Sequence, residues 1–329
     1  MSISIDSLSI DFTTNQGVVH AVRNASIKTE PGRIIGVVGE SGSGKSTLGL
    51  ALLGLLANNA RVTSGKLTLD TESFDLTKPR TTASLRGSRL AMIFQDPLSS
   101  LNPVFTIRSH LYEVLRSKSS IIDRSSWSVV SEEALASVGL DRPLQRLDQY
   151  PYELSGGMRQ RVAIAMALIA KPELLIADEP TTALDVTVEA QVMKEILKLR
   201  EAVGCTILFI SHSLGLVAQH CDDICVLYSG EVLEQGKVSE VLDQPGHPYT
   251  KALLNCEVTL EQPSALDRSE NRFQVVPGDL PDPRVLTPGC IFRNRCAFAF
   301  EPCANVIPPN YPVGAYAGHL ARCHLRAPG

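Results

Sequence analysis

The stretch Gly39-Glu-Ser-Gly-Ser-Gly-Lys-Ser-Thr47 decides the fold, because it fits the pattern G-x-x-x-x-G-K-[ST]. Glycines in such a loop allow backbone N–H groups to point inward and surround phosphate oxygens. Lys45 adds a positive charge at the β- and γ-phosphates of a nucleotide, and the Ser46 hydroxyl can coordinate Mg²⁺. A helix that begins here directs the positive end of its dipole at the anion. We therefore expect ATP and Mg²⁺ to bind at Gly39, Ser41, Gly42, Gly44, Lys45, Ser46 and Thr47.

The residues around this loop predict an α/β fold. A short apolar run, Ile34–Val38, leads into the loop, and a helix is expected from about Lys45 to Leu56. Three further runs have the same character: Ala91–Phe94, Leu174–Ala177 and Thr206–Ile210. Runs that are short, continuous and rich in Ile, Leu and Val indicate buried parallel strands. Helical spacing lies between them, as in Val188–Ala202, so we expect a mostly parallel sheet with crossover helices.

Two regions differ from this alternation. From about Asp96 to Lys171 there is no comparable strand, and the segment is predicted to be mostly helical. After His247 prolines become frequent, which predicts a loop-rich appendage. We therefore expect an α/β domain at residues 1–245, with a helical subdomain at about 96–171, and a small C-terminal domain at residues 246–329.

An acidic pair follows one of the predicted strands, in Leu174-Leu-Ile-Ala-Asp-Glu179. Ligands of open α/β sheets bind outside the carboxyl ends of the strands. Asp178 therefore fits the acidic residue that helps to hold Mg²⁺. Glu179 fits a general base that polarises the attacking water. Combined with the phosphate loop, this pair predicts hydrolysis of ATP.

Charge and hydropathy exclude other classes. The 329 residues are 44% hydrophobic and 20% charged, and their net charge of −4 argues against nucleic-acid binding, which favours a basic face. No apolar run reaches the ~18–20 residues that span a bilayer. The N-terminus lacks the basic and apolar regions of a secretory signal. We therefore expect a cytosolic protein whose membrane attachment comes through a partner.

A further motif, Leu154-Ser-Gly-Gly-Met-Arg-Gln160, resembles the signature motif of the ATP-binding-cassette (ABC) family. Ser155 is a good helix N-cap, and the glycines after it leave backbone N–H groups open to an anion. The resemblance implies that this motif closes over the nucleotide held by the opposite subunit of a head-to-tail dimer. The residues implied in that contact are Ser155, Gly156, Gly157 and Gln160.

Other residues match the ABC pattern in family order. Gln95 follows the strand Ala91–Phe94 as the Q-loop residue does, and Asp185 fits the D-loop. His212 follows the strand Thr206–Ser211 as the switch histidine does, and Phe12 stands where the family places an aromatic that stacks on adenine. The resemblance, which covers roughly residues 3–245, implies catalytic roles for Lys45, Gln95, Glu179 and His212.

Three stretches resemble the peptide-importer group within that family: Phe94–Pro103, Gly246–Leu254 and the Pro288-Gly-Cys290 sequence. This resemblance to ATPase subunits of dipeptide, oligopeptide and nickel importers implies four partner subunits. They are a related second ATPase, two membrane permeases and an extracytoplasmic solute-binding protein. The implied location is the cytoplasmic face of the inner membrane. A soluble ABC ATPase of translation or repair is an alternative, as is an importer of nickel or another non-peptide solute.

The eight cysteines fall into two sets. A cytosolic location argues against structural disulfides, so we interpret the first set as small buried hydrophobes: Cys205, Cys221, Cys225 and Cys256. The second set lies in the proline-rich C-terminal segment: Cys290, Cys296, Cys303 and Cys323.

Four thiolates can hold tetrahedral Zn²⁺ or a [4Fe–4S] cluster, and a small loop-rich unit commonly needs such a staple. The intervals of x5, x6 and x19 differ from the short C-x₂-C pairs of zinc ribbons. The resemblance to peptide importers favours the [4Fe–4S] cluster. Zinc, a disulfide pair and four unlinked thiols are the alternatives, and His319 and His324, which flank Cys323, are lesser ligand candidates.

Overall fold

The strands are divided between two compact units of the chain. The computed structural model describes residues 3–96, 100–118, 121–182, 185–261 and 276–328. Contacts between Cα atoms divide the chain into a first unit, which comprises Met1–Thr29, Arg33–Pro79 and Ile210–Gly329, and a second unit, which comprises Glu30–Gly32 and Arg80–Phe209. The C-terminal region and the phosphate loop thus belong to the same unit.

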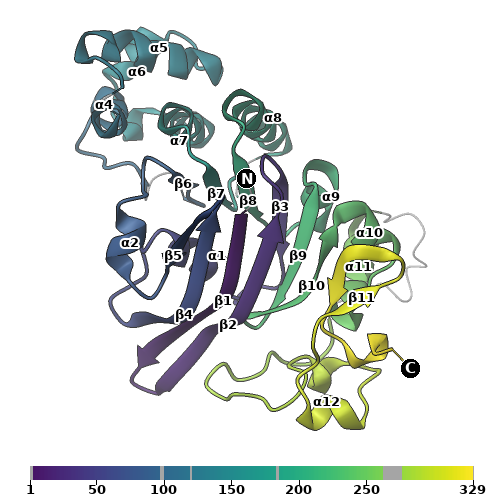
Figure 1. The fold of residues 1–329 in the computed structure, drawn as a ribbon. Coiled ribbons are helices and arrows are strands. Elements are labelled where there is room, and N and C mark those ends of the chain that lie inside the picture. Colours follow the sequence, from purple (N-terminus) through teal and green to yellow (C-terminus); the bar gives the residue numbers. More distant parts are fainter. Residues whose placement is uncertain (1–2, 97–99, 119–120, 183–184, 262–275, 329) are drawn as a thin grey trace. The chain divides into compact units, whose positions relative to one another are not determined.

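An antiparallel sheet of the first unit has the strand order β2-β1-β4-β5 (Figure 1). Its strands are β1 (Ile3–Thr14), β2 (Gly17–Thr29), β4 (Ala60–Leu69) and β5 (Glu72–Asp75). One face of β1 is buried, through Ile3, Ile5, Leu8 and Ile10. These strands were not among the predicted ones, because their apolar residues alternate with polar ones rather than forming continuous runs.

The other strands of the first unit have the order β11-β12-β10-β9-β3. They are β3 (Ile34–Val38), β9 (Asp223–Tyr228), β10 (Glu231–Lys237), β11 (Tyr311–Val313) and β12 (Tyr316–Ala321). β3 and β9 are parallel, whereas β9, β10, β12 and β11 pair antiparallel in succession. The helices of this unit are α1 (Lys45–Leu52), α9 (Leu214–His220), α10 (Val238–Asp243), α11 (Pro248–Glu261) and α12 (Glu301–Asn305).

The second unit holds the strands β8 (Thr206–Ile210), β7 (Leu174–Asp178) and β6 (Leu90–Ile93), in that order. The last residue of β8, Ile210, is already counted with the first unit. β6 and β7 are parallel. Its helices are α4 (Ile107–Ser117), α5 (Trp127–Ser137), α6 (Pro143–Leu147), α7 (Gly156–Ala170) and α8 (Val186–Val203), and a short helix, α2 (Pro79–Ala83), stands at its start. The predicted α/β class and the helical character of the segment between β6 and β7 are confirmed.

One expectation needs correction. The helix predicted to reach Leu56 ends at Leu52, because Gly54 adopts a left-handed conformation (φ 63°) that closes the helix. The loop-rich C-terminal region also contains two short strands, β11 and β12, which extend the sheet of the first unit through β10. These strands were not predicted, because prolines are frequent around them. Their partner β10 is also far away in the sequence.

A buried carboxylate fastens the C-terminal region to this sheet. Glu234 of β10 and His319 of β12 are both fully buried, and Nε2 of His319 lies 2.6 Å from Oε1 of Glu234. The same carboxylate accepts the backbone N–H groups of Gly246 (2.5 Å) and His247 (2.8 Å). The turn before α11 and strand β12 are therefore both held by one side chain of β10.

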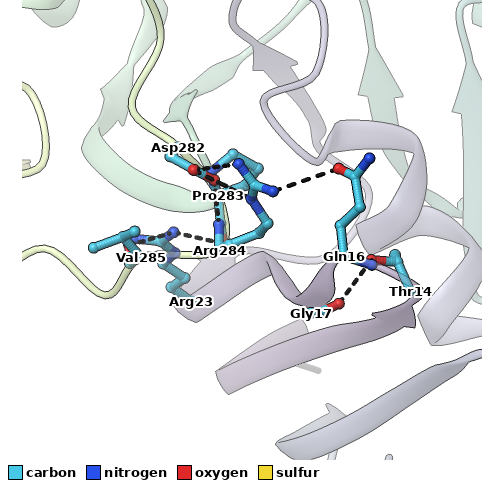
Figure 2. Close-up of polar contacts among 8 residues, drawn as sticks. All are labelled: Thr14, Gln16, Gly17, Arg23, Asp282, Pro283, Arg284 and Val285. Atoms are coloured by element: carbon cyan, nitrogen blue, oxygen red, sulfur yellow. Dashed lines mark hydrogen bonds and ion pairs between the residues drawn. The ribbon is translucent and has the colours of Figure 1, made fainter.

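A second attachment joins the C-terminal region to the antiparallel sheet, where residues 282–285 lie against β2 (Figure 2). The buried Arg23 donates from Nη2 to the carbonyl oxygens of Pro283 (3.2 Å) and Val285 (3.3 Å). Arg284 pairs with Asp282 at 2.7 Å and donates to the side chain of Gln16 (3.4 Å) in the turn between β1 and β2. Backbone and side-chain contacts thus join the segment 282–285 to β2 and to the turn before it.

Candidate functional site

The phosphate loop of the first unit has a backbone that only glycine fits at two places. All five residues of β3 are buried, and the loop joins this strand to α1. Gly39 has φ 155°, and a Cβ atom there would lie 2.0 Å from the carbonyl oxygen of Leu227. Gly44 has φ 100°, and a Cβ atom there would lie 2.5 Å from the carbonyl oxygen of Ala21. The loop is therefore held close to neighbouring backbone, as a phosphate cradle requires.

Lys45 extends its side chain back along this loop. The residue is 6% exposed, and its Nζ donates to the carbonyl oxygens of Gly39 (2.7 Å) and Glu40 (3.0 Å). Gly44 is the N-cap of α1, so the start of the helix also faces the loop. A buried ammonium group and a helix N-terminus at one loop form a site for an anion such as a nucleotide phosphate.

The acidic pair belongs to the second unit. Every residue of β7 is buried, and the strand ends at Asp178, which is 6% exposed. Glu179 has φ 45°, a left-handed conformation that is strained for a residue with a side chain. Its Oε2 accepts hydrogen bonds from Nε2 of Gln95 and Oγ1 of Thr182, both at 2.9 Å. The structure thus brings together Gln95 and Glu179, which the sequence had placed in one site, and adds Thr182, which it had not.

The signature motif forms the start of α7. The Ser155 side chain accepts the N–H of Met158 (3.4 Å), as an N-cap does. Apart from the neighbouring residues and backbone of its own helix, no described atom lies within 4 Å of the position that a Cβ would take on Gly156, whereas a Cβ on Gly157 would lie 2.8 Å from Val188. Gln160 is 1% exposed, and among the described residues its side-chain amide has no hydrogen-bond partner. Ser155 and Gly156 therefore present an open helix N-terminus, while the Gln160 side chain points inward.

The remaining predicted residues lie at ends or edges of elements. Asp185 caps α8 by accepting the N–H of Val188 (3.0 Å). His212 is exposed directly after β8. Phe12 is half-buried on β1, where it pairs with Val19 of β2 and Ala60 of β4. Their proposed roles toward ATP stay predictions.

Burial lowers the reactivity of three thiols of the first set, those of Cys205, Cys221 and Cys225. Cys205 and Cys225 are buried, and burial raises the pKa of their thiols to about 11 and about 12. Burial also raises the pKa of Cys221, which is half-buried like Cys256. A raised pKa keeps a thiol protonated and therefore a poor nucleophile.

The four C-terminal cysteines gather in one place without forming a ligand set. Burial raises the pKa of Cys290 to about 11, and the nearby Cys303, Cys323 and Cys296 add to this rise through charge repulsion. Within the described parts of the chain, no three His, Cys, Asp or Glu side chains stand close enough together to hold a metal ion. Burial also raises the pKa of Cys296 and Cys323, which disfavours the metal-binding thiolate form of these two side chains. The structure therefore gives the predicted zinc or [4Fe–4S] centre no support.

The two histidines near Cys323 have other partners. His319 bonds to Glu234, and Nε2 of His324 lies 2.8 Å from the carbonyl oxygen of Val306. Neither ring is directed at a thiol by these contacts.

Two family models match separate parts of the chain. The model of the ABC transporter family matches residues 22–182, which include the phosphate loop, Gln95, the signature motif and the acidic pair. A peptide import ATP-binding protein of Brucella ovis is 40% identical over 98% of this chain and 96% of its own length. The chain belongs to the ABC transporter family. The second model, the C-terminal region of oligopeptide/dipeptide transporters, matches residues 233–303 of this ABC protein.

Further comparisons agree with this assignment. A peptide ABC transporter ATP-binding protein of Sinorhizobium fredii is 38% identical over 98% of this ABC ATPase and 94% of the relative. A dimeric ATP-binding cassette, solved in a post-hydrolysis state with ADP and Pi, is 25% identical with a TM-score of 0.62. It covers 72% of this chain and 98% of its own. The protein is thus an ATPase of the ABC class, and Mg²⁺ is the metal that accompanies ATP in such enzymes. In the described residues, no helix is both long and apolar enough to cross a bilayer.

Replacing Glu179 with Gln should leave nucleotide binding intact and lower ATP turnover by at least ~10²-fold, because the amide keeps the shape but cannot accept a proton. Steady-state phosphate release and equilibrium nucleotide binding measure the two effects. Glu201→Gln, which changes an exposed carboxylate of the same unit, is the matched control and should leave turnover unchanged. Near-normal turnover of Glu179→Gln would contradict the assignment.

Proposed function

We propose that this protein is the ATP-hydrolysing subunit that powers the uptake of peptides by an ABC importer. The observation that carries the proposal is the match of residues 233–303 to the C-terminal region of oligopeptide/dipeptide transporters. Relatives named for peptide import, which align over nearly the whole chain, support it. The same match favours an importer over a soluble ABC ATPase of translation or repair. An importer of nickel or another non-peptide solute is the second candidate.

The proposed assembly contains this subunit, a related second ATPase, two membrane permeases and an extracytoplasmic solute-binding protein. Attachment to the permeases would place the subunit on the cytoplasmic face of the inner membrane. We also propose a functional boundary near residue 245, between the ATP-binding domain and the C-terminal domain, with the helical subdomain at about 96–171 facing the permeases. The separate matches of residues 22–182 and 233–303 support a division of the chain into two functional parts.

At the site, Lys45 would hold the β- and γ-phosphates, with the loop residues Gly39, Ser41, Gly42, Gly44, Ser46 and Thr47 around them. Ser46 and Asp178 offer the hard oxygen ligands that Mg²⁺ prefers. Bound Mg²⁺ supplies positive charge at the phosphate oxygens. Glu179 would act as the general base, because the hydrogen bonds from Gln95 and Thr182 orient its carboxylate.

The other predicted residues would have further roles in nucleotide binding and hydrolysis. Phe12 would stack on adenine, and His212 would stabilise charge on the transferred phosphoryl group. Ser155 and Gly156 would bind the nucleotide of the opposite subunit through open N–H groups, with Asp185 near the subunit contact. A similar solved cassette is dimeric with ADP and Pi bound, which supports the pairing of two ATPase subunits.

Peptide addition should stimulate ATP hydrolysis by the assembled complex in proteoliposomes, because the solute-binding protein passes its load to permeases that act on the ATPase. Phosphate release is measured with dipeptides, with oligopeptides and, in a parallel reaction, with Ni²⁺. Stimulation by Ni²⁺ alone would favour the second candidate. A failure of this chain to associate with any permease would contradict the importer proposal itself.

The head-to-tail dimer predicts that two substitutions damage different nucleotide sites. Lys45→Ala should weaken binding at this chain's own phosphate loop. Gly156→Asp has open space for its side chain, and an acid is favourable at a helix N-terminus, so the fold should tolerate it. Its negative charge should repel the phosphates bound by the partner. Heterodimers with one mutant subunit at a time, assayed by nucleotide labelling of each subunit, should show the two defects on opposite subunits; defects on the same subunit would refute the arrangement.

We also propose that the isolated protein binds one metal centre, a [4Fe–4S] cluster or Zn²⁺, through its four C-terminal cysteines: Cys290, Cys296, Cys303 and Cys323. The proposal depends on the spacing of these cysteines in the sequence. Anaerobic purification followed by iron, sulfide and zinc analysis and a visible absorption spectrum tests it. Iron with sulfide indicates a [4Fe–4S] cluster, and one equivalent of zinc without sulfide indicates a zinc site. Colourless protein with neither metal and four alkylatable thiols would contradict the proposal.

A further inference from the structure

Glu40, the second residue of the phosphate loop, is bonded through all three of its polar groups. Its carbonyl oxygen accepts from Nζ of Lys45 at 3.0 Å. Its backbone N–H donates to the hydroxyl oxygen of Tyr249 at 3.0 Å. Its Oε2 forms an ion pair with Nη1 of Arg295 at 2.9 Å. Glu40 therefore links the lysine of the phosphate loop to two residues of the C-terminal region.

Arg295 is fixed in the position from which it meets Glu40. Its side chain is only 5% exposed. Nε donates to the carbonyl oxygen of Pro277 (2.8 Å) and Nη2 to that of Val276 (2.6 Å). The guanidinium group also lies over the ring of Tyr228, 5.7 Å from its centroid. Since every one of these bonds constrains the planar guanidinium group, little freedom is left to lose when it binds the carboxylate.

Tyr249 is fixed by packing rather than by charge. The ring is fully buried, and its centroid lies 4.7 Å from that of Tyr228 and 5.3 Å from that of Phe292. Phe292 comes from the C-terminal region and also packs edge-on against Tyr228 at 5.2 Å. The buried rings of Tyr228 and Phe292 thus hold the Tyr249 ring, so that its hydroxyl meets the backbone at the start of the phosphate loop.

The charge of Glu40 gives this arrangement a consequence for ATP. A carboxylate within a phosphate-binding loop repels phosphate, and because only 25% of the Glu40 side chain is exposed, water screens this repulsion only in part. Oε1 of Glu40 is buried and has no hydrogen-bond partner among the described residues, whereas Oε2 pairs with Arg295, which supplies a positive charge against this carboxylate. Removing Arg295 would leave a negative charge uncompensated beside the phosphates.

We propose that Arg295 and Tyr249 are positioning residues for ATP binding, which act through Glu40 to neutralise and hold the phosphate loop. The C-terminal region then contributes directly to the nucleotide site of its own chain. All of these residues lie in one compact unit, so the inference depends on the ATPase activity and not on which solute is carried.

Arg295→Met in the full-length chain should raise the Kd for Mg·ADP by on the order of tenfold, about the effect of losing one charged hydrogen bond. Mg·ADP is the probe because it fills the chain's own phosphate loop without turnover. Glu40→Gln introduced into Arg295→Met should restore most of the lost affinity, since it removes the uncompensated charge. A residue that only supports the fold would not be rescued in this way. Arg295→Lys, which keeps the charge, should bind more tightly than Arg295→Met.

Arg293→Met is the matched control, because Arg293 stands in the same turn and donates to the carbonyl oxygens of Pro288 and Ala304 within the C-terminal region. It should leave the Kd unchanged. An Arg295→Met variant that binds Mg·ADP as wild type does, an equal loss in Arg293→Met, or a double variant no better than Arg295→Met would each overturn the proposal.

Tyr249→Phe tests the second contact, because it keeps the ring and removes the acceptor of the Glu40 N–H. In the assembled complex it should raise the KM for ATP several-fold, while kcat stays close to wild type. Loss of kcat with unchanged KM would count against a positioning role.

Discussion

The C-terminal half of the first unit depends on the buried carboxylate of Glu234. A carboxylate removed from water is stable only when donors replace the lost hydration. Here the donors are the His319 ring and the N–H groups of Gly246 and His247. Burial lowers the pKa of His247 to about 4, so its ring is neutral near pH 7 and adds no second charge. Loss of the carboxylate would strand several buried donors, a defect of about 3–5 kcal/mol.

The bonds of Glu234 also influence the phosphate loop, through the segment that leads into α11. Because Glu234 fixes the N–H groups of Gly246 and His247, it also fixes where α11 begins, and Tyr249 is the second residue of that helix. The Nδ1 atom of His247 accepts the N–H of Tyr249 at 3.0 Å, which continues the same chain of bonds. Through Tyr249, this series of bonds connects Glu234 to the backbone N–H of Glu40 in the phosphate loop, although the two glutamates are far apart in the sequence.

What the sequence predicted well depends on short-range patterns. The phosphate loop, β3, β7 and the acidic pair are contiguous motifs, so each could be identified without knowing the fold. Glu40 occupies a variable position of the loop motif, and Arg295 is 255 residues away from it, so no local pattern marks their ion pair. The strands β11 and β12 were missed for the same reason. Gln160 shows the opposite error, because membership of a motif did not reveal that its side chain is buried.

The backbone of Glu179 shows what the fold gives up in stability for its activity. A non-glycine residue at φ 45° is strained by roughly 1–2 kcal/mol. Glycine there would relieve the strain but would remove the carboxylate that Gln95 and Thr182 orient. A protein redesigned for folding stability alone would therefore favour glycine at this position, and it would lose the carboxylate that we propose as the general base.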